Sequence, residues 1–155
     1  MGARIIAIDV VEDRLVLAKE LGADSVLNAS KGDTVEAILD LTAGRGVEAS
    51  VECSGNSSAR VNALKCTQQW GRVCFVGLGE PTTFDVFKDV ILKQLSISGS
   101  WTFSTHGLAD CARFVVDRRV PLGKLVTHKF GLDQAGEAFA AFEGGNTGKC
   151  VLVVP

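Results

Sequence analysis

The chain has 155 residues, of which 46% are hydrophobic and 22% charged, and its formal net charge is −2. This balance is typical of one globular domain with a sizeable core. The apolar stretches are too short to cross a bilayer, no signal peptide is visible, and the longest basic run is Arg118-Arg119. We therefore expect no membrane and no nucleic-acid partner.

Seven segments carry the apolar residues that are typical of strands. In chain order they lie at residues 4–9, 25–27, 47–53, 72–77, 95–100, 125–130 and 149–154. Strands that alternate with helices of about ten residues form parallel sheets. The pattern predicts an α/β fold with a doubly wound, mostly parallel Rossmann-type sheet. A short α+β segment is expected to follow, so that the domains are residues 1–101 and 102–155.

Turn and capping residues are expected to bound the helices between these strands. In chain order they are Gly22, Asp33, Gly44, Asn56, Gly71, Asp85, Asp133 and Gly144. Asp33 is followed three residues later by Glu36, as in a capping box. The third helix is predicted to run from Asn56 to about Trp70.

The cysteines and histidines show no site pattern. The five cysteines are odd in number and widely spaced, which favours buried thiols in a reducing cytoplasm over a disulfide frame. No CxxC occurs and the two histidines lie far apart, so we expect no metal ligands. No nucleophile–base set is recognisable either, and no catalytic residue is assigned.

Asp9 ends the first apolar strand, and Arg14 follows five residues later. In doubly wound folds a carboxylate here accepts hydrogen bonds from the ribose hydroxyls of adenosine and repels a 2′-phosphate, which favours NAD over NADP. An aspartate after a strand is also typical of a turn or of a helix N-cap. Asp9 alone leaves both interpretations open.

The predicted strands of residues 1–101 end in small or polar residues. These clusters are Asp9-Val10, Cys53-Ser54-Gly55, Val76-Gly77-Leu78-Gly79 and Gly99-Ser100-Trp101-Thr102. The carboxyl ends of parallel strands line one crevice in which ligands bind, and glycines there let a flat ligand approach the backbone. Each glycine alone is explained by a tight turn, but together they favour a ligand groove.

The order and spacing of several motifs resemble the zinc-dependent medium-chain dehydrogenases, and among them the alcohol, polyol and threonine dehydrogenases. The motifs are Asp9-xxxx-Arg14, Ala18-xx-Leu21-Gly22-Ala23-Asp24, Val51-Glu52-Cys53-Ser54-Gly55, Gly71-Arg72-Val73-xx-Val76-Gly77, Ile97-xx-Ser100 and Gly148-Lys149-Cys150-Val151-Leu152. The resemblance covers essentially the whole chain. It implies a nucleotide-binding part of an NAD-linked alcohol or polyol dehydrogenase.

The resemblance assigns the adenosine half of NAD to five residues. Asp9 and Arg14 would hold the ribose, Val10 and Ser54 would flank the adenine, and Lys149 would lie near the pyrophosphate.

The nicotinamide half would lie against the ends of later strands. Val76, Leu78 and the backbone near Thr102 would hold the nicotinamide and its carboxamide, and Gly55 and Gly77 would let it approach the backbone. The strand from Leu95 to Ser100 would form the family's usual dimer interface, which implies a homo-oligomer.

Two parts of the family pattern are expected to be missing. Only a few residues precede the first strand here, so the family's first Rossmann strand and its glycine-rich phosphate loop are not found. The zinc ligands belong to a catalytic domain that the resemblance places elsewhere. We therefore expect weak NAD binding and no activity of this chain alone.

Two other functions stay open at this point. A non-catalytic nucleotide-binding or assembly module would keep the ribose and nicotinamide contacts without chemistry. An S-adenosylmethionine methyltransferase also ends its second strand in an acidic ribose ligand, but is less well supported.

In the usual strand order, the missing strand would leave a gap between residues 4–9 and 47–53. Direct pairing of these strands, a strand from a neighbouring chain, or detachment of the first strand could close it, and an oligomer is favoured because unpaired edges associate.

Overall fold

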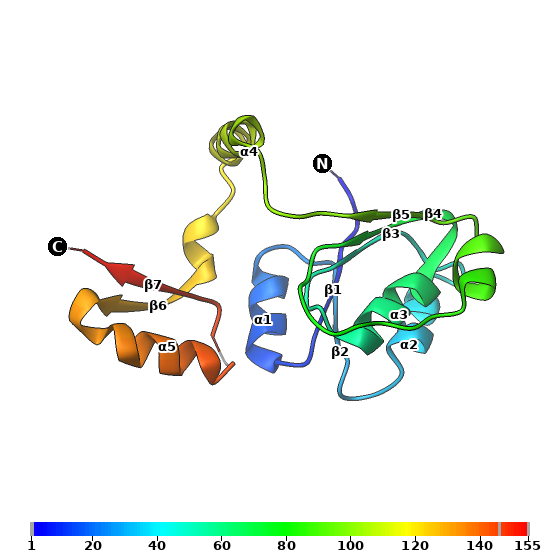
Figure 1. Ribbon diagram of the computed structural model, residues 1–155, viewed down its shortest axis with the longest axis horizontal. Coiled ribbons are helices and arrows are strands. Elements are labelled where there is room, and N and C mark those ends of the chain that lie inside the picture. The colour runs from blue at the N-terminus through cyan, green and yellow to red at the C-terminus, as the bar shows by residue number, and fades with distance from the viewer. Residues whose placement is uncertain (1, 146, 155) are drawn as a thin grey trace. The chain divides into compact units, whose positions relative to one another are not determined.

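A computed structural model describes residues 2–145 and 147–154 (Figure 1). Strands and helices alternate along the chain, and every strand pair is parallel. The predicted α/β class with parallel strands is confirmed. None of the helices in the described ranges has the length and apolar character that a bilayer span requires. The chain falls into two compact units, Met1–Lys31 with Ser104–Pro155, and Gly32–Phe103.

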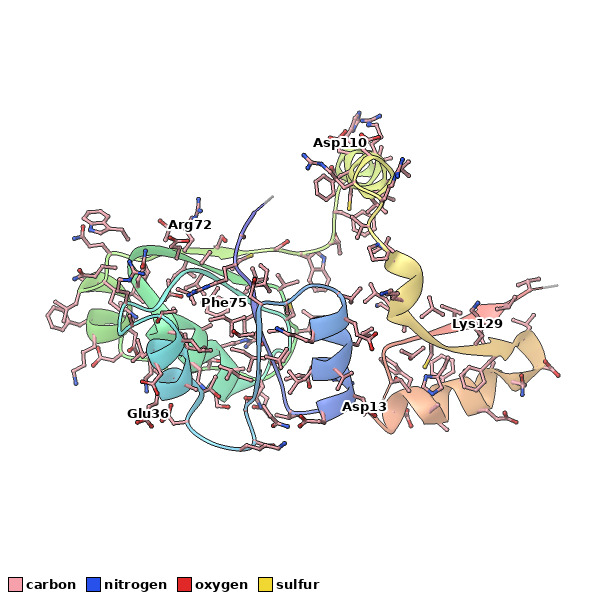
Figure 2. All side chains as sticks on the ribbon, turned by 180° about the vertical axis from the view of Figure 1, so that it is seen from behind. Asp13, Glu36, Arg72, Phe75, Asp110 and Lys129 are labelled. Atoms are coloured by element: carbon pink, nitrogen blue, oxygen red, sulfur yellow. The ribbon has the colours of Figure 1, made fainter. Side chains whose placement is uncertain are left out.

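The first unit contains two parallel strand pairs with their helices. β1 (Ile6–Asp9) pairs with β2 (Ser25–Asn28), and α1 (Glu12–Glu20) connects them. β6 (Val126–Gly131) pairs with β7 (Lys149–Val153), and they are connected by η3 (Leu132–Gln134) and α5 (Ala135–Glu143), which packs on both strands. Two further helices of this unit are α4 (Thr105–Asp117) and η2 (Leu122–Leu125). Figure 2 shows side chains all around α4, near Asp110, and none of its residues is buried.

The second unit is a three-stranded sheet in the order β3 (Val47–Glu52), β4 (Thr67–Phe75) and β5 (Ser96–Gly99). The helices α2 (Thr34–Leu41) and α3 (Ser57–Cys66) lie side by side below these strands in Figure 1, and α3 packs on β3 and β4. A single π-helical turn, η1 (Val86–Ile91), precedes β5. The core of this unit is centred on Leu64, Cys66, Thr67 and Val73, which are nearly inaccessible to solvent.

Three predicted caps of the second unit are confirmed by hydrogen bonds. The Asp33 carboxylate accepts from the N–H groups of Val35 and Glu36 at 2.8 and 3.0 Å. Asn56 caps α3 and Asp85 caps η1 in the same way. Such caps satisfy helix N–H groups that have no partner within the helix, so they locate helix starts reliably.

The end of α3 was predicted wrongly. The helix ends at Cys66, not near Trp70, because Thr67 already pairs with Val47 in the β3–β4 ladder. The Thr67 hydroxyl lies 2.7 Å from the Ala63 carbonyl oxygen and 2.7 Å from the Ser50 hydroxyl, which fastens the helix end to β3. An irregularity follows, in which Trp70 has a φ of 62°. Here pairing with a strand distant in sequence overrides the local helical pattern.

The cap of the last helix was also predicted wrongly. The N-cap residue of α5 is Gln134, not Asp133, and it makes no side-chain cap bond to α5; its side chain instead accepts the Gly131 N–H at 3.0 Å at the start of η3. The helix begins later than expected because the 3-10 turn η3 lies between β6 and α5.

Among the five cysteines only Cys66 is buried, whereas Cys53 and Cys111 are exposed and the other two are intermediate. The expectation of buried thiols is therefore wrong for Cys53 and Cys111. Cys53 follows the end of β3, and Cys111 lies on α4, which buries no residue. An apolar neighbourhood in sequence does not by itself place a thiol in a core.

Burial raises the pKa of the Cys66 thiol from its ordinary value of 9.0 to about 11. A folded pKa above the unfolded one gives stability that is complete below about pH 9 and is lost as the pH rises through about 11. We expect a smaller alkaline loss of stability in Cys66→Ala than in the wild type, measured as the shift of the urea midpoint between pH 8 and pH 10.5. Cys111→Ala removes an exposed thiol and should keep the wild-type shift. Equal shifts in all three proteins would contradict this assignment.

Candidate functional site

The carboxylate of Asp9 has a different role for each of its oxygens. Oδ1 accepts hydrogen bonds from the N–H groups of Val10 and Val11 at 2.8 and 3.0 Å, which holds the turn between β1 and α1. Oδ2 lies 3.6 Å from Nη1 of Arg14, and the Asp9 side chain is 29% exposed. The turn-forming interpretation is therefore correct, but it occupies only one oxygen. The other oxygen remains able to accept a hydrogen bond from a ligand.

Arg14 also contacts a segment that is far away in sequence. Its Nε donates to the Thr147 carbonyl oxygen at 3.3 Å, and its Nη2 donates to the carbonyl oxygen of Gly145. Thr147 lies two residues before Lys149, which is exposed at the start of β7. These bonds fix the guanidinium beside Asp9 and connect the end of β1 to the segment that leads into β7. The sequence gives no signal for this contact.

Glu52 organises the second group of predicted site residues and was missed at the sequence level. Glu52 is only 6% exposed. Its Oε1 accepts hydrogen bonds from the Ser54 N–H at 2.6 Å, the Gly55 N–H at 3.0 Å and the Ser54 hydroxyl. Its backbone oxygen accepts from the N–H groups of Val76 and Gly77 at 2.8 and 3.0 Å. One residue therefore connects the loop after β3 with the loop after β4.

The glycines of these two loops touch backbone to backbone. A Cβ on Gly55, whose φ is +76°, would lie 1.8 Å from the Leu78 carbonyl oxygen. A Cβ on Gly77 would lie 2.2 Å from the Gly55 nitrogen, and one on Gly79 would lie 2.3 Å from the Gly55 oxygen. Leu78 is held between them, with its side chain 70% exposed. The two loops form one surface on which only glycine fits at the crossing points.

Arg60, from α3, is the partner of Glu52. Its Nε lies 3.7 Å from Glu52 Oε2, and its Nη2 donates to the Gly77 carbonyl oxygen at 2.8 Å. Its Nη1 donates to the carbonyl oxygen of Glu80. Arg60 also borders a hollow of about 300 Å³, together with Phe75 (labelled in Figure 2), Thr82 and Phe84. Glu52 and Arg60 are eight residues apart, and a loop and a helix turn lie between them. No local sequence rule predicts an ion pair at this spacing.

Two further predicted residues of the second unit follow strand ends. Val76 is 41% exposed beyond the end of β4. Thr102, with a φ of 50°, lies between β5 and α4. The ten predicted site residues thus divide between the units: Asp9, Val10, Arg14 and Lys149 belong to the first, and Ser54, Gly55, Val76, Gly77, Leu78 and Thr102 to the second.

These groups offer hydrogen bonds and apolar contacts. Burial, with the adjacent Glu52 carboxylate, raises the pKa of the Cys53 thiol, which opposes its use as a thiolate nucleophile. Within residues 2–145 and 147–154 no three His, Cys, Asp or Glu side chains are grouped so that they could hold a metal ion. The groups presented are one carboxylate oxygen, fixed backbone amides and carbonyls, and exposed apolar side chains.

Comparison with known proteins decides the family. A family model described as zinc-binding dehydrogenase matches residues 1–117. The chain belongs to the zinc-binding dehydrogenases. The match extends over three quarters of the chain, from before β1 to the end of α4. The resemblance noted in the sequence is therefore confirmed.

Relatives of this zinc-binding dehydrogenase chain include proteins of known and unknown activity. It is 37% identical to an uncharacterized zinc-type alcohol dehydrogenase-like protein, YphC, of Escherichia coli, over 98% of this chain and 43% of that protein. It is 35% identical to the L-threonine 3-dehydrogenase of Symbiobacterium thermophilum, over 98% of this chain and 44% of that enzyme.

Solved structures agree with these relatives. The crystal structure of benzyl alcohol dehydrogenase from Acinetobacter calcoaceticus matches with a TM-score of 0.87 and 29% identity, over 99% of this chain and 43% of that one. An alcohol dehydrogenase from Aeropyrum pernix matches with a TM-score of 0.86 and 29% identity, over 99% and 44%. The Rossmann-type fold is confirmed. The chain spans less than half the length of these relatives.

Proposed function

We propose that this chain is the NAD-binding portion of a zinc-dependent alcohol or polyol dehydrogenase. The observation that carries the proposal is the Asp9 carboxylate at the end of β1, with one oxygen fixed in the turn and the other beside Arg14 and accessible. A carboxylate at the end of such a strand is the usual acceptor of adenosine ribose hydroxyls in doubly wound folds, which supports this role for Asp9. Residues 1–101 would form the coenzyme-binding domain, and residues 102–155 would pack on a catalytic domain.

The resemblance assigns a role to the candidate residues of each unit. In the first, Asp9 would accept the ribose hydroxyls, Val10 would lie against the adenine, and Lys149 would approach the pyrophosphate. In the second, the exposed side chains of Val76 and Leu78 support a role in holding the nicotinamide. Ser54 would flank the adenine, and the backbone near Thr102 would hold the carboxamide.

Zinc does not fit the described residues, because no group of suitable ligands exists among them. In enzymes of this kind a bound zinc polarises the alcohol oxygen, while hydride passes to the nicotinamide. The residues of this chain would hold and orient the coenzyme. We therefore derive no catalytic step from them.

Titration of the 155-residue chain with NAD tests the proposal. Calorimetry or ligand-observed NMR should show NAD binding in the millimolar range, with NADP weaker, because the contacts proposed here are mainly to ribose and nicotinamide, whereas phosphate affinity in such folds comes largely from loop and helix N-terminal amides. No binding of NAD or ADP-ribose would reject the proposal. Micromolar affinity would instead favour a dedicated, non-catalytic binding module. S-adenosylmethionine, titrated in parallel, should not compete, since the family membership favours the dehydrogenase over the methyltransferase.

The purified chain should show no alcohol-dependent formation of NADH. The assay combines NAD, zinc and a panel of alcohols, sugar alcohols and L-threonine, and follows absorbance of the reduced nicotinamide. The physical reason is the missing metal-ligand group among the described residues. Turnover that persists through successive purification steps and is abolished by Asp9→Asn would contradict this prediction.

The edge strand β5 is the proposed dimer contact. All four of its residues are exposed, it pairs with β4 alone within the described residues, and Trp101 and Phe103 beyond it are 71% and 68% exposed. Such an open apolar edge favours pairing with a second copy. We expect light scattering to give a dimer for the wild type and a monomer for Ile97→Lys. A wild type that is monodisperse and monomeric would rule out this interface.

A further inference from the structure

The side chains of Glu52 and Arg60 form a largely buried ion pair that contacts both the loop after β3 and the loop after β4. Glu52 holds the loop after β3 with its carboxylate and the loop after β4 with its backbone oxygen. Arg60 pairs with that carboxylate and donates to the carbonyl oxygens of Gly77 and Glu80. Neither loop can move without breaking hydrogen bonds to one of these two side chains.

A buried ion pair by itself contributes little net stability. Removing two charges from water costs several kcal/mol, and well-packed apolar residues are often equally stabilising or better. Here the side chains of Glu52 and Arg60 are only 4% and 18% exposed. Arg60 Nε has no hydrogen-bond partner in the described part of the chain, but Nη1 and Nη2 of Arg60 and Oε1 of Glu52 bond to loop backbone groups, so the pair fixes where those groups point.

We propose that Glu52 and Arg60 are positioning residues that set the geometry of the nicotinamide-binding loops. This inference rests on the proposed NAD-binding function. The loop from Val76 to Gly79 would hold the nicotinamide. The Arg60 side chain holds this loop at the Gly77 carbonyl oxygen, and the Glu52 carboxylate holds Gly55, whose backbone the loop touches. Neither side chain need touch the coenzyme. The adenosine half is assigned mainly to Asp9 and Arg14. Its one link to the pair is Ser54, which the Glu52 carboxylate holds, so it should change much less than the nicotinamide half.

Two variants perturb the pair without a large change of volume. Glu52→Gln places an NH₂ group against the donors of Gly55 or Arg60, so at least one hydrogen bond or ion pair is replaced by two opposed donors. Arg60→Lys keeps the positive charge but cannot reach Glu52, Gly77 and Glu80 at once, because an ammonium lacks the planar fork. The second variant keeps the test available if the first fails to fold.

A matched control weakens the same unit elsewhere. Asp33→Ala removes the N-cap of α2, whose hydrogen bonds go to Val35 and Glu36. It should lower the melting temperature without changing either loop. A merely structural role of the pair would make Glu52→Gln and Asp33→Ala behave alike in binding.

The readout compares NAD with ADP-ribose, which lacks the nicotinamide, by saturation-transfer NMR on the full 155-residue chain. We expect Glu52→Gln and Arg60→Lys to weaken NAD about tenfold, the equivalent of one lost hydrogen bond, while ADP-ribose changes less than about twofold. The saturation of nicotinamide protons should fall relative to that of adenine protons. Asp33→Ala should leave both the affinity ratio and the proton pattern unchanged.

The opposite results overturn the proposal in distinguishable ways. If folded variants bind NAD as the wild type does, or lose NAD and ADP-ribose equally, the pair has no positioning role although the proposed function stands. If Asp33→Ala changes the ratio as much as Glu52→Gln, the pair acts only through stability. If the wild type binds neither ligand, the proposed function itself is rejected, and the positioning role with it.

Discussion

Asp9→Asn should weaken NAD binding by roughly 10- to 150-fold, because loss of a hydrogen bond to a charged group costs about 1.5–3 kcal/mol. Asparagine keeps a carbonyl oxygen that can accept from Val10 and Val11, so the turn after β1 should survive. The negative charge is lost, so discrimination against NADP should fall as well. Affinities for NAD and NADP, measured by ligand-observed NMR, check both effects.

The matched control for Asp9→Asn is Asp24→Asn. Asp24 accepts the Ile5 N–H at 2.7 Å near the opposite end of β1, so the same chemical change is made where the ribose is not expected. Its NAD affinity should equal that of the wild type. Unchanged NAD affinity in a folded Asp9→Asn protein would remove Asp9 from the site and leave it as a turn former.

Gly55→Ala should destabilise the second unit by about 3 kcal/mol. A clash inside a packed structure costs about 1–3 kcal/mol, and the left-handed conformation adds about 1–2 kcal/mol for a residue with a Cβ. The new Cβ would meet the Leu78 carbonyl carbon and oxygen, which belong to backbone and cannot rotate away. For a chain of this size the loss corresponds to a melting temperature lower by roughly 6–12 °C. Thermal unfolding followed by circular dichroism measures it.

Two further glycine variants separate the effect of the steric clash from that of the left-handed backbone conformation. Gly77→Ala introduces a clash with Gly55 and Cys53 at a residue without positive φ, so it should show the steric part alone. The new Cβ of Gly32→Ala meets nothing within 4 Å, so the free energy of unfolding of this variant should lie within about 0.5 kcal/mol of the wild-type value. If Gly55→Ala melts as Gly32→Ala does, the close approach of the two loops is not present in solution.

Local sequence patterns predicted those structural features that depend on interactions between residues close in sequence. The caps at Asp33, Asn56 and Asp85 were found because a side-chain oxygen satisfies N–H groups two or three residues ahead. The parallel arrangement followed from the alternation of strands and helices. The end of α3 was missed because pairing of Thr67 with β3 decides it, and that partner is about twenty residues away.

The candidate site was predicted unevenly for the same reason. Asp9 and the strand-end glycines carry signals in their own neighbourhood, namely a carboxylate or a small residue after an apolar run. Glu52 lies within a motif of the resemblance but was given no role, and Arg60 carries no signal, since it looks like an ordinary charged residue of a helix. The contact of Arg14 with Thr147 spans 133 positions, and no spacing rule reaches so far.

The sequence by itself determined the α/β class, because periodicity and caps are read within a few positions. The resemblance carried by motifs along the whole chain supplied the family and most of the candidate coenzyme residues. Only the tertiary structure decided which polar groups are free to bind. Folding uses one Asp9 oxygen for a turn, buries Glu52 against Arg60, and presses the backbones of Gly55, Gly77 and Gly79 together. The physical reason is that burial and hydrogen-bond satisfaction depend on neighbours that the fold, and not the chain order, brings into contact.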